Sequence, residues 1–417
     1  MDVALINANV IVGDGTYLED ATIKLEGARI GVVGRDLDAS ATKVIDLDGY
    51  CVVPGLIDCH THIAGGDMGP GGFTAEASHM EDHVIEAVMK TLEAASRTLR
   101  AGVTTIREVG GRDYIDVYLR DAQRRGLVTA PHVVASGPGV AMTGGHATFL
   151  DPDHVADGEL GVRRRVRELV GNGVDAIKIF STEGPETSGD PYTRQFTDEE
   201  IAAIVSEGHR LNRLVGAHAI GESAIDAAVA AGCDTVEHGW FMSEQAADRM
   251  VEAGSYVVPT LGVVTDTNRY GEELAIPAYD IPGEDEAKIV TENMRMIFDK
   301  GVRVAMGSDC GGFAPRRIGR SADELTHYEA CGMSSMDAIR AATGVAAEAL
   351  RLDREVGTID AGKWADLVIV KGDPLSNLEL LQNGISAVVH CGEPVRDDED
   401  LLGRFERFAG VEAISVV

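Results

Sequence analysis

The middle of the chain alternates short apolar runs with longer stretches in which hydrophobic positions recur at helical spacing. The apolar runs predict about eight β-strands, at residues 55–63, 104–109, 132–136, 176–180, 215–220, 235–238, 256–261 and 303–309. The stretches between them predict helices, for example at residues 83–100, 198–213 and 286–300. Strands that alternate with helices are typical of a parallel sheet covered by helices, and about eight such units predict an α/β fold of the closed (β/α)8 TIM-barrel type.

The two chain ends have a different pattern, in which short strand-like runs are separated by turns rich in Gly and Asp. Near the N-terminus these runs are residues 3–12, 21–26, 30–33 and 43–47, and the same style returns at 366–370 and 385–390. We expect the strands of the two ends to pair. The sequence therefore predicts a small β-sandwich domain made of residues 1–55 and 355–417, interrupted by a barrel domain at 56–354.

Two histidines, His60 and His62, follow the largely apolar segment 52–59. Side chains two positions apart on a strand face the same way, so both imidazoles are expected to project to one side. Neutral imidazole nitrogen suits borderline cations such as zinc. Taken alone, the pair could equally be two unrelated polar residues at a strand end, so the other strands decide between these interpretations.

Four further strand candidates carry an unusual polar residue near their C-terminal ends: Lys178, His218, His238 and Asp309. These ends meet on one face of a barrel, where catalytic groups converge. Each residue has a plainer interpretation, because a histidine can be a hydrogen-bonded core residue, a lysine can extend to solvent and an aspartate can cap a turn. The combination in this strand order nevertheless indicates a single site with the chemistry of a metal centre.

Composition limits the possible partners and compartment. The 417 residues include 68 Asp and Glu against 37 Lys and Arg, for a formal charge of −31, and a field of this sign repels a polyphosphate backbone. No apolar run reaches the ~18 residues of a membrane helix, and the N-terminus does not read as an export signal. The six cysteines form no Cys-x-x-Cys pair, which favours reduced, structural thiols. We therefore expect a cytoplasmic protein that binds neither nucleic acid nor membrane.

With these residues in place, the chain resembles the amidohydrolase superfamily over almost its whole length. Four segments carry the resemblance: 54–62 (PGLIDCHTH), 237–239 (EHG), 307–309 (GSD) and 357–368 (GTIDAGKWADLV). Two more, 143–146 (TGGH) and 258–261 (VPTL), resemble the branch of Xaa-Pro dipeptidases and Xaa-Arg carboxypeptidases, which is related to imidazolonepropionase. Relatives of this kind commonly form homo-oligomers, so a homo-oligomer with a small-molecule substrate is expected.

The resemblance implies two divalent metal ions, expected to be zinc, and the following ligands: His60, His62, Lys178, His218, His238 and Asp309. Lys178 would carry carbon dioxide as N6-carboxylysine and bridge the ions, which explains a lysine in a buried metal site. A hydroxide between the ions would be the nucleophile, and Asp309 would take its proton and pass it to the leaving amine. His146 would contact the substrate carbonyl and stabilise the oxyanion, although its glycine-rich loop could be only a turn.

Substrate-binding residues are less strongly indicated. Arg107 and Tyr114 could bind a substrate carboxylate, but they could equally pack a helix against the barrel. The segment 311–320 (GGFAPRRIGR) lacks a histidine that relatives often carry there. Its arginines, Arg316 among them, could clamp a substrate carboxylate or pair with nearby acids.

We therefore expect a binuclear metal-dependent hydrolase of a carbon–nitrogen bond, with a dipeptide or an N-acyl amino acid as the leading substrate. A carbamate or a urea is a near variant. The alternative within enzymes is a mononuclear cyclic-amide hydrolase or deaminase that resembles imidazolonepropionase, which would not need Lys178. A non-catalytic scaffold of the same fold is disfavoured by the complete ligand set.

Overall fold

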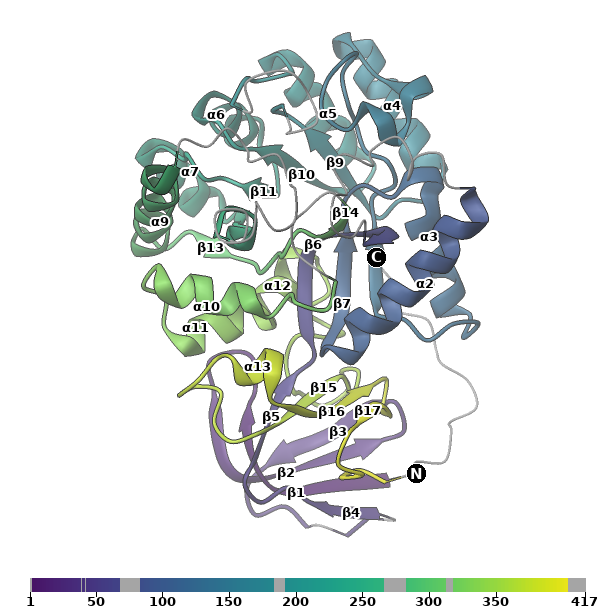
Figure 1. Cartoon of the computed structure of the whole chain (residues 1–417), viewed down its shortest axis with the longest axis vertical. Helices are drawn as coiled ribbons and strands as arrows, with labels where there is room; N and C mark the ends of the chain where they lie inside the picture. Colours follow the sequence, from purple (N-terminus) through teal and green to yellow (C-terminus); the bar gives the residue numbers. More distant parts are fainter. Residues whose placement is uncertain are drawn as a thin grey trace.

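The computed structural model describes residues 2–38, 40–41, 43–67, 83–183, 192–265, 283–312 and 318–403. Three β-sheets carry its architecture. One sheet of eight strands contains both ends of the described chain and lies at one end of the molecule, and two parallel sheets with helices around them make up the remainder (Figure 1).

The eight-stranded sheet has the order β17-β16-β15-β5-β1-β2-β3, with β4 paired to β1. Its strands are β1 (Asp2–Ile11), β2 (Tyr17–Glu26), β3 (Arg29–Gly34), β4 (Lys43–Asp46), β5 (Tyr50–Pro54), β15 (Leu367–Lys371), β16 (Ile385–His390) and β17 (Glu393–Asp397). β5 pairs antiparallel with β15, with Pro54 opposite Leu367, so the expected pairing of the two chain ends is confirmed. Inward-facing side chains of both ends, such as Val10, Ile23 and Ile369, share one core.

The first parallel sheet has the order β14-β6-β7-β8, and the second has the order β13-β12-β11-β10-β9. The strands of the first are β6 (Leu56–Asp67), β7 (Val103–Glu108), β8 (His132–Ala135) and β14 (Cys310–Gly312). Those of the second are β9 (Ala176–Phe180), β10 (Leu214–Ala219), β11 (Thr235–His238), β12 (Tyr256–Val258) and β13 (Arg303–Val304). All neighbours are parallel, which confirms the strand order expected from the alternating pattern.

Backbone hydrogen bonds join the two parallel sheets to each other along both edges. Beyond the end of β8, the Val140 N–H donates to the carbonyl of Lys178 on β9 at 2.9 Å. On the other side, the Cys59 N–H of β6 donates to the carbonyl of Met306, which follows β13, at 2.8 Å. These contacts place β6 and β9, two strands with candidate ligands, within one continuous arrangement of strands.

The helices lie around the parallel sheets and at their junction with the eight-stranded sheet (Figure 1). They include α2 (Val84–Arg100), α3 (Ile115–Arg124), α4 (Gly158–Gly171), α5 (Asp198–Arg210), α6 (Glu222–Ala231), α7 (Glu244–Ala253), α9 (Gly283–Asp299), α10 (Asp323–Ala330), α11 (Ser335–Ala341), α12 (Gly344–Ala349) and α13 (Leu380–Asn383). The three helices predicted by periodicity are confirmed, with ends that shift by a few residues. Among the described helices, none combines the length and the apolar character needed to cross a membrane.

Helix α5 shows how the sequence sets these elements. Thr197 accepts a hydrogen bond from the Glu200 N–H, and the Glu200 side chain accepts one from the Thr197 N–H, which forms a capping box at the helix N-terminus. The helix ends at Arg210 and not at residue 213 as expected, because Asn212 has a left-handed backbone with φ of 56°. Its apolar face, with Ile201 and Ile204, is fully buried.

Two predicted strands are shorter than expected, and both lie beside the candidate site. β12 stops at Val258 because Pro259 has no N–H to donate and Thr260 has a φ of 50°. β13 covers only the start of the predicted strand 303–309, and the chain then runs irregularly past β6. A Cβ on Gly307 would lie 2.3 Å from Cγ1 of Val258, so this close approach requires glycine.

Candidate metal centre

The structure brings the six predicted ligand residues to the C-terminal side of the parallel strands: His60 and His62 on β6, Lys178 on β9, His218 on β10, His238 on β11, and Asp309 after β13. One ligand atom from each of His60, His238 and Asp309 lies within 4.8 Å of the other two. This set of two imidazole nitrogens and one carboxylate oxygen is of the kind that a divalent ion such as zinc accepts. The donor set therefore fits a metal ion.

Asp309 faces both histidines of β6. Its Oδ1 lies 3.2 Å from Nε2 of His62 and 3.6 Å from Nε2 of His60. The two imidazole rings have centroids 5.3 Å apart, so they project to the same side of β6 as the His-x-His spacing predicts. Burial raises the pKa of Asp309, but the electrostatic interaction with His60, the hydrogen bond from His62 and the nearby Lys178 outweigh it and hold the pKa below its usual value. Asp309 is therefore an ionised carboxylate.

His218 and His238 form a second pair of imidazoles. Nε2 of His238 lies 2.8 Å from Nδ1 of His218, and the rings of His60 and His238 have centroids 5.1 Å apart. The other nitrogens are held by the protein: Nδ1 of His238 lies 2.7 Å from Oγ1 of Thr260, and Nε2 of His218 lies 3.3 Å from the carbonyl oxygen of Glu183. These contacts fix the ring orientations, as the partners of metal-binding histidines do.

Burial keeps three histidines of the site, His60, His218 and His238, neutral. The pKa values of His60, His218 and His238 lie well below the usual value, first because burial disfavours the imidazolium and then because neighbouring positive groups repel it. For His60 the main such neighbour is Lys178. Neutral imidazoles offer lone pairs, so these side chains are ready to act as ligands near neutral pH.

Lys178 is buried among these histidines, with 2% of its surface exposed. Its Nζ lies 3.5 Å from Nε2 of His60. Burial lowers the pKa of Lys178 to about 8 although the carboxylates of Glu237 and Asp309 raise it. The environment therefore favours a neutral amine far more than water does.

Two buried residues hold His60 in place: Glu237, for which the sequence predicted no role, and Arg107, which was a candidate for substrate binding. Oε2 of Glu237 lies 2.9 Å from Nδ1 of His60, and Nη2 of Arg107 donates to Oε1 of Glu237 at 2.7 Å. Arg107 also donates to the carbonyl of Cys59 and to Oγ1 of Thr235. Because Arg107 is 1% exposed and bonded to protein groups, the structure supports a positioning role for it in place of the predicted contact with substrate.

Glycine provides the room for this buried charge pair. A Cβ on Gly216 of β10 would lie 2.7 Å from Oε1 of Glu237 and 3.2 Å from Nη1 of Arg107. The sequence does carry a signal for the pair, because Arg107 and Glu237 are charged residues inside predicted strands, and a charge that is buried there needs a partner.

Asp58 is a further positioning residue that the sequence analysis missed. Its Oδ1 accepts hydrogen bonds from the N–H groups of His60 at 3.1 Å and of Ser308 at 3.0 Å. The fully buried carboxylate thus ties β6 to the segment that carries Asp309. Asp309 and His238 both have a positive φ, of 57° and 69°, and backbone strain of this kind is concentrated at functional sites.

His146, predicted from the glycine-rich segment 143–146, lies beside the ligand residues. Its ring centroid is 4.5 Å from that of His218 and 5.1 Å from that of Phe180. The His146 N–H donates to Oε1 of Gln195 at 3.2 Å, which anchors the loop to the segment that precedes α5. His146 is only partly buried, so it is placed at the edge of the candidate site.

The remaining substrate-binding candidates lie elsewhere or outside the described residues. The hydroxyl of Tyr114 accepts a hydrogen bond from Nδ2 of Asn172, at the C-terminus of α4, at 3.1 Å, and this contact supports the packing interpretation. Arg316 lies outside the described residues. Arg320 of the same segment donates two hydrogen bonds, of 2.8 and 2.9 Å, to Asp323. This contact agrees with the alternative prediction that arginines of this segment pair with nearby acids.

Residues 51–395 match the model of the amidohydrolase family. The chain belongs to the amidohydrolase family. This amidohydrolase is similar to ochratoxinase of Aspergillus niger, with 27% identity over 425 residues that cover 93% of this chain and 85% of the relative. Among solved structures it is similar to a Xaa-Pro dipeptidase with bound methionine, at 29% identity and a TM-score of 0.84, covering 94% of this chain and 99% of that one. A prolidase in complex with N-methylphosphonate-L-proline is equally similar, at 29% identity and a TM-score of 0.84, covering 95% and 100%.

These comparisons establish the class of enzyme and the architecture of its relatives. The amidohydrolase is a hydrolase that acts on carbon–nitrogen bonds. Its structural neighbours imply a TIM-barrel fold with a β-sandwich domain, in line with the two parallel sheets and the eight-stranded sheet described above. The family generally uses divalent metal ions, and the histidine and aspartate side chains at the strand ends could bind them.

Proposed function

We propose that this amidohydrolase uses two divalent metal ions to cleave the amide bond of a dipeptide or an N-acyl amino acid. The observation that carries the proposal is the convergence of ligand-type side chains from β6, β9, β10, β11 and the segment after β13 on one buried centre. Lys178 favours two ions over one, because a mononuclear site has no need of a lysine in its interior. The centre would lie at the mouth of a closed (β/α)8 barrel formed by residues 56–354, with a β-sandwich domain of residues 1–55 and 355–417.

The proposed ligands divide into two groups. His60, His62 and Asp309 would hold one ion, His218 and His238 would hold the other, and zinc is the expected metal. When bound, such ions polarise a substrate carbonyl and lower the pKa of water towards neutrality, which supplies the hydroxide for hydrolysis. The short distances within each group support the assignment. The neutral imidazoles of His60, His218 and His238 support it as well.

Lys178 is proposed to be N6-carboxylysine that bridges the two groups. The neutral amine would attack the carbon of carbon dioxide, form an N–C bond and release one proton, which leaves an anionic carbamate. Burial supports this step because it lowers the pKa of Lys178 and so provides the neutral amine. The product is an anionic oxygen ligand, which removes the cost of an unpaired ammonium among histidines.

The proton transfers of hydrolysis are proposed to use Asp309. Its carboxylate is ionised, and it lies beside both β6 histidines, so it can accept a proton from the attacking water and give it to the leaving amine. His146 lies next to His218, where its imidazole could donate a hydrogen bond to the carbonyl oxygen of the substrate as negative charge develops there.

The substrate class is proposed from the relatives. One relative is a Xaa-Pro dipeptidase, and another is a prolidase bound to N-methylphosphonate-L-proline. Both names point to an amino acid whose nitrogen is joined to a second group. The phosphonate places a tetrahedral phosphorus where a substrate has its planar carbonyl carbon, and its proline carries a free carboxylate. An amino acid with a free carboxylate is therefore the proposed leaving group, and carbamates and ureas are the second class to examine.

Metal content tests the proposed centre. Protein purified in the presence of bicarbonate should contain about two divalent ions per chain, and Lys178→Ala should lose metal and hydrolytic activity. Lys288→Ala, on the exposed face of α9, is the matched control and should keep both. A Lys178→Ala protein with unchanged metal content and full activity would favour the mononuclear cyclic-amide hydrolase instead. Wild-type protein that takes up no metal would favour the non-catalytic scaffold.

Paired substrates test the proposed leaving group. N-acyl amino acids and dipeptides would be compared with the same compounds in which the carboxylate is blocked as an amide. We expect hydrolysis of the free acids and a loss of at least about tenfold in kcat/KM on blocking, because a lost charged contact removes roughly 1.5 kcal/mol or more. Equal rates for both forms, or faster hydrolysis of carbamates or ureas, would contradict this leaving group while leaving the metal centre intact.

A further inference from the structure

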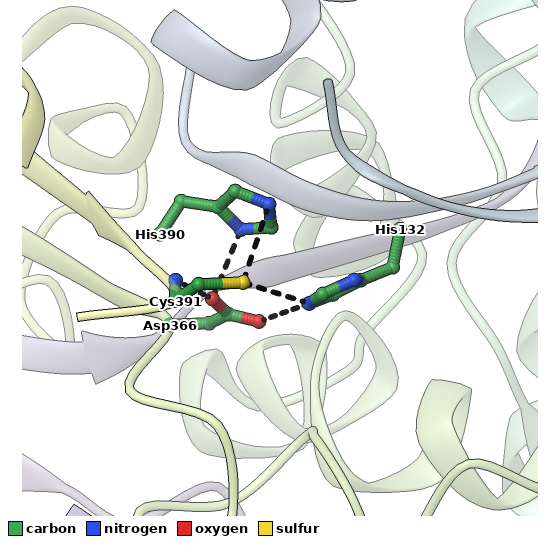
Figure 2. Close-up of side chains that lie close together, drawn as sticks. All are labelled: His132, Asp366, His390 and Cys391. Carbon is green, nitrogen blue, oxygen red and sulfur yellow. Dashed lines mark hydrogen bonds and ion pairs between the residues drawn. The ribbon is translucent and has the colours of Figure 1, made fainter. Parts of the chain in front are cut away.

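A second group of metal-ligating side chains lies away from the candidate metal centre: His132, Asp366, His390 and Cys391 (Figure 2). His132 is the first residue of β8, so it lies at the N-terminal end of the parallel sheet, opposite the end that carries the candidate active site. The other three come from the eight-stranded sheet, directly before β15 and at the end of β16. The group therefore joins two sheets that are far apart in the sequence.

The four side chains converge on one point. Nε2 of His132 lies 3.0 Å from Oδ2 of Asp366, and Nδ1 of His390 lies 2.9 Å from Oδ1 of the same carboxylate. Sγ of Cys391 lies 3.7 Å from Nε2 of His132 and 3.7 Å from Nε2 of His390. One ligand atom from each of the four residues lies within 4.8 Å of those of the other three. All four residues are buried, with at most 8% of their surface exposed.

We propose that His132, Asp366, His390 and Cys391 form a structural site for a tetrahedral divalent ion of the zinc type. Imidazole, carboxylate and thiolate are the ligands that zinc takes in closed, four-coordinate structural sites. Bonds of roughly 2.0 to 2.3 Å at tetrahedral angles separate neighbouring ligand atoms by about 3.4 to 3.6 Å. The contacts of the thiol with Nε2 of both histidines are already close to this spacing, and the contact of Asp366 with Nε2 of His132 needs to widen by about half an ångström.

Charge supports the same assignment. A divalent ion with one thiolate, one carboxylate and two neutral imidazoles has no net charge, which suits a buried position. The protein-only alternative is a hydrogen-bonded network in which Asp366 pairs with a protonated histidine. In that alternative Nδ1 of His390, which is buried and lies 2.9 Å from Oδ1 of Asp366, still makes no aligned hydrogen bond.

Neighbouring groups hold the ligands as the partners of metal sites do. The Cys391 N–H donates to Oδ1 of Asp366 at 2.7 Å, which fixes the carboxylate. Nδ1 of His132 lies 3.3 Å from Nε2 of Gln123. A flip of this amide would put its oxygen there, where it would accept the Nδ1 proton and leave Nε2 of His132 free for an ion. An ion here would tie β8 to β15 and β16.

Cobalt substitution tests the site on the whole protein. Metal-free protein would be titrated with Co²⁺, and a thiolate ligand should produce a near-ultraviolet charge-transfer band that histidine and carboxylate ligands do not give. We expect the amplitude of this band at saturation to correspond to about one thiolate-bound cobalt per chain in the wild type, within a total uptake of about three. A wild-type protein that shows no band after saturation with cobalt would overturn the proposal and leave the hydrogen-bonded network.

Cysteine variants assign the band. Cys391→Ser should lose it and one equivalent of metal while keeping hydrolytic activity, because Cys391 lies at the opposite end of the sheet from the candidate active site. Cys331→Ser, a buried cysteine that ends α10, is the matched control and should keep the band. A band that survives in Cys391→Ser would overturn the proposal. If Cys391→Ser does not fold, Cys310→Ser decides, since a band that vanishes with Cys310, next to Asp309, belongs to the other centre.

Discussion

Oε2 of Glu237 lies 2.9 Å from Nδ1 of His60, so a buried carboxylate on β11 orients a ligand-type imidazole on β6. A carboxylate at Nδ1 keeps the proton on that nitrogen and leaves the lone pair of Nε2 directed towards Asp309 and Lys178. The proposed centre therefore depends on a residue that would not touch the metal.

Substitution of Glu237 should weaken metal binding. In Glu237→Gln an uncharged amide replaces the carboxylate that faces Nδ1 of His60, and Arg107 loses its buried counter-ion. We expect metal affinity to fall by about 10- to 100-fold, measured by competition with a chelator. Glu244→Gln, on the exposed N-terminal turn of α7, should bind metal as the wild type does. Equal affinity in the two variants would show that Glu237 does not orient His60.

His146 should affect catalysis without affecting metal content. Its ring lies next to His218, but we place it towards the substrate. His146→Asn is expected to lower kcat/KM by about 10²- to 10³-fold, as the loss of an oxyanion donor does, at unchanged metal stoichiometry. The surface residue His154 provides the control, because His154→Asn should leave both quantities unchanged. Loss of metal in His146→Asn would instead make His146 a ligand.

The buried charge pair should depend on a glycine. In Gly216→Ala the new methyl group would lie 2.6 Å from Oγ1 of Thr235 and 2.7 Å from Oε1 of Glu237. We expect a loss of about 1–3 kcal/mol in the free energy of unfolding, because neither buried group can move freely. Gly171→Ala, at the end of α4, meets no atom within 4 Å and should be nearly neutral. Urea denaturation of the two variants checks the difference.

Glu207 should make stability depend on pH in the acid range. Hydrogen bonds from Arg210 and Arg167 lower the pKa of Glu207 from 4.5 to about 2. Since the folded-state pKa lies below the unfolded value, the stabilisation is complete above about pH 4.5 and is lost as the pH falls towards 2. Glu207→Gln should therefore lose about 1 kcal/mol at pH 7 and progressively less below pH 4.5.

Urea denaturation across this pH range measures the effect of Glu207→Gln. Glu252→Gln, on the exposed side of α7, serves as the control and should follow the wild type at every pH. A difference between Glu207→Gln and the wild type that stays constant from pH 7 to pH 3 would mean that the carboxylate of Glu207 contributes through packing and not through its charge.

Much of the fold and of the candidate site is readable from the sequence, because local pattern determines both. β9 and β11 have the predicted bounds: β9 is a largely apolar run, and β11 is followed at once by Gly239. The predicted ligands lie together because parallel strands bring their C-terminal ends to one face. By contrast, β12 and β13 are cut short by Pro259 and by the irregular path around Gly307, which period-two reasoning does not detect.

The parts that were missed depend on contacts between distant segments. The pairing of Arg107 with Glu237 needs the space above Gly216, which only the folded sheet reveals. His132 and Cys391 have no motif spacing that would suggest a common site, since one begins a strand of the parallel sheet and the other follows β16. Isolated residues of this kind become informative only when the tertiary structure brings them together.

The pairing of β5 with β15 also bears on how the chain folds during synthesis. β5 leaves the ribosome early and can pair at once with β1, but its other edge has no partner until Leu367–Lys371 has been made. An unpaired edge attracts other strands, so the nascent chain carries an aggregation-prone edge while the intervening segment is translated. Chains truncated before β15 should therefore aggregate, even though every proposed metal ligand of the candidate active site has already been synthesised.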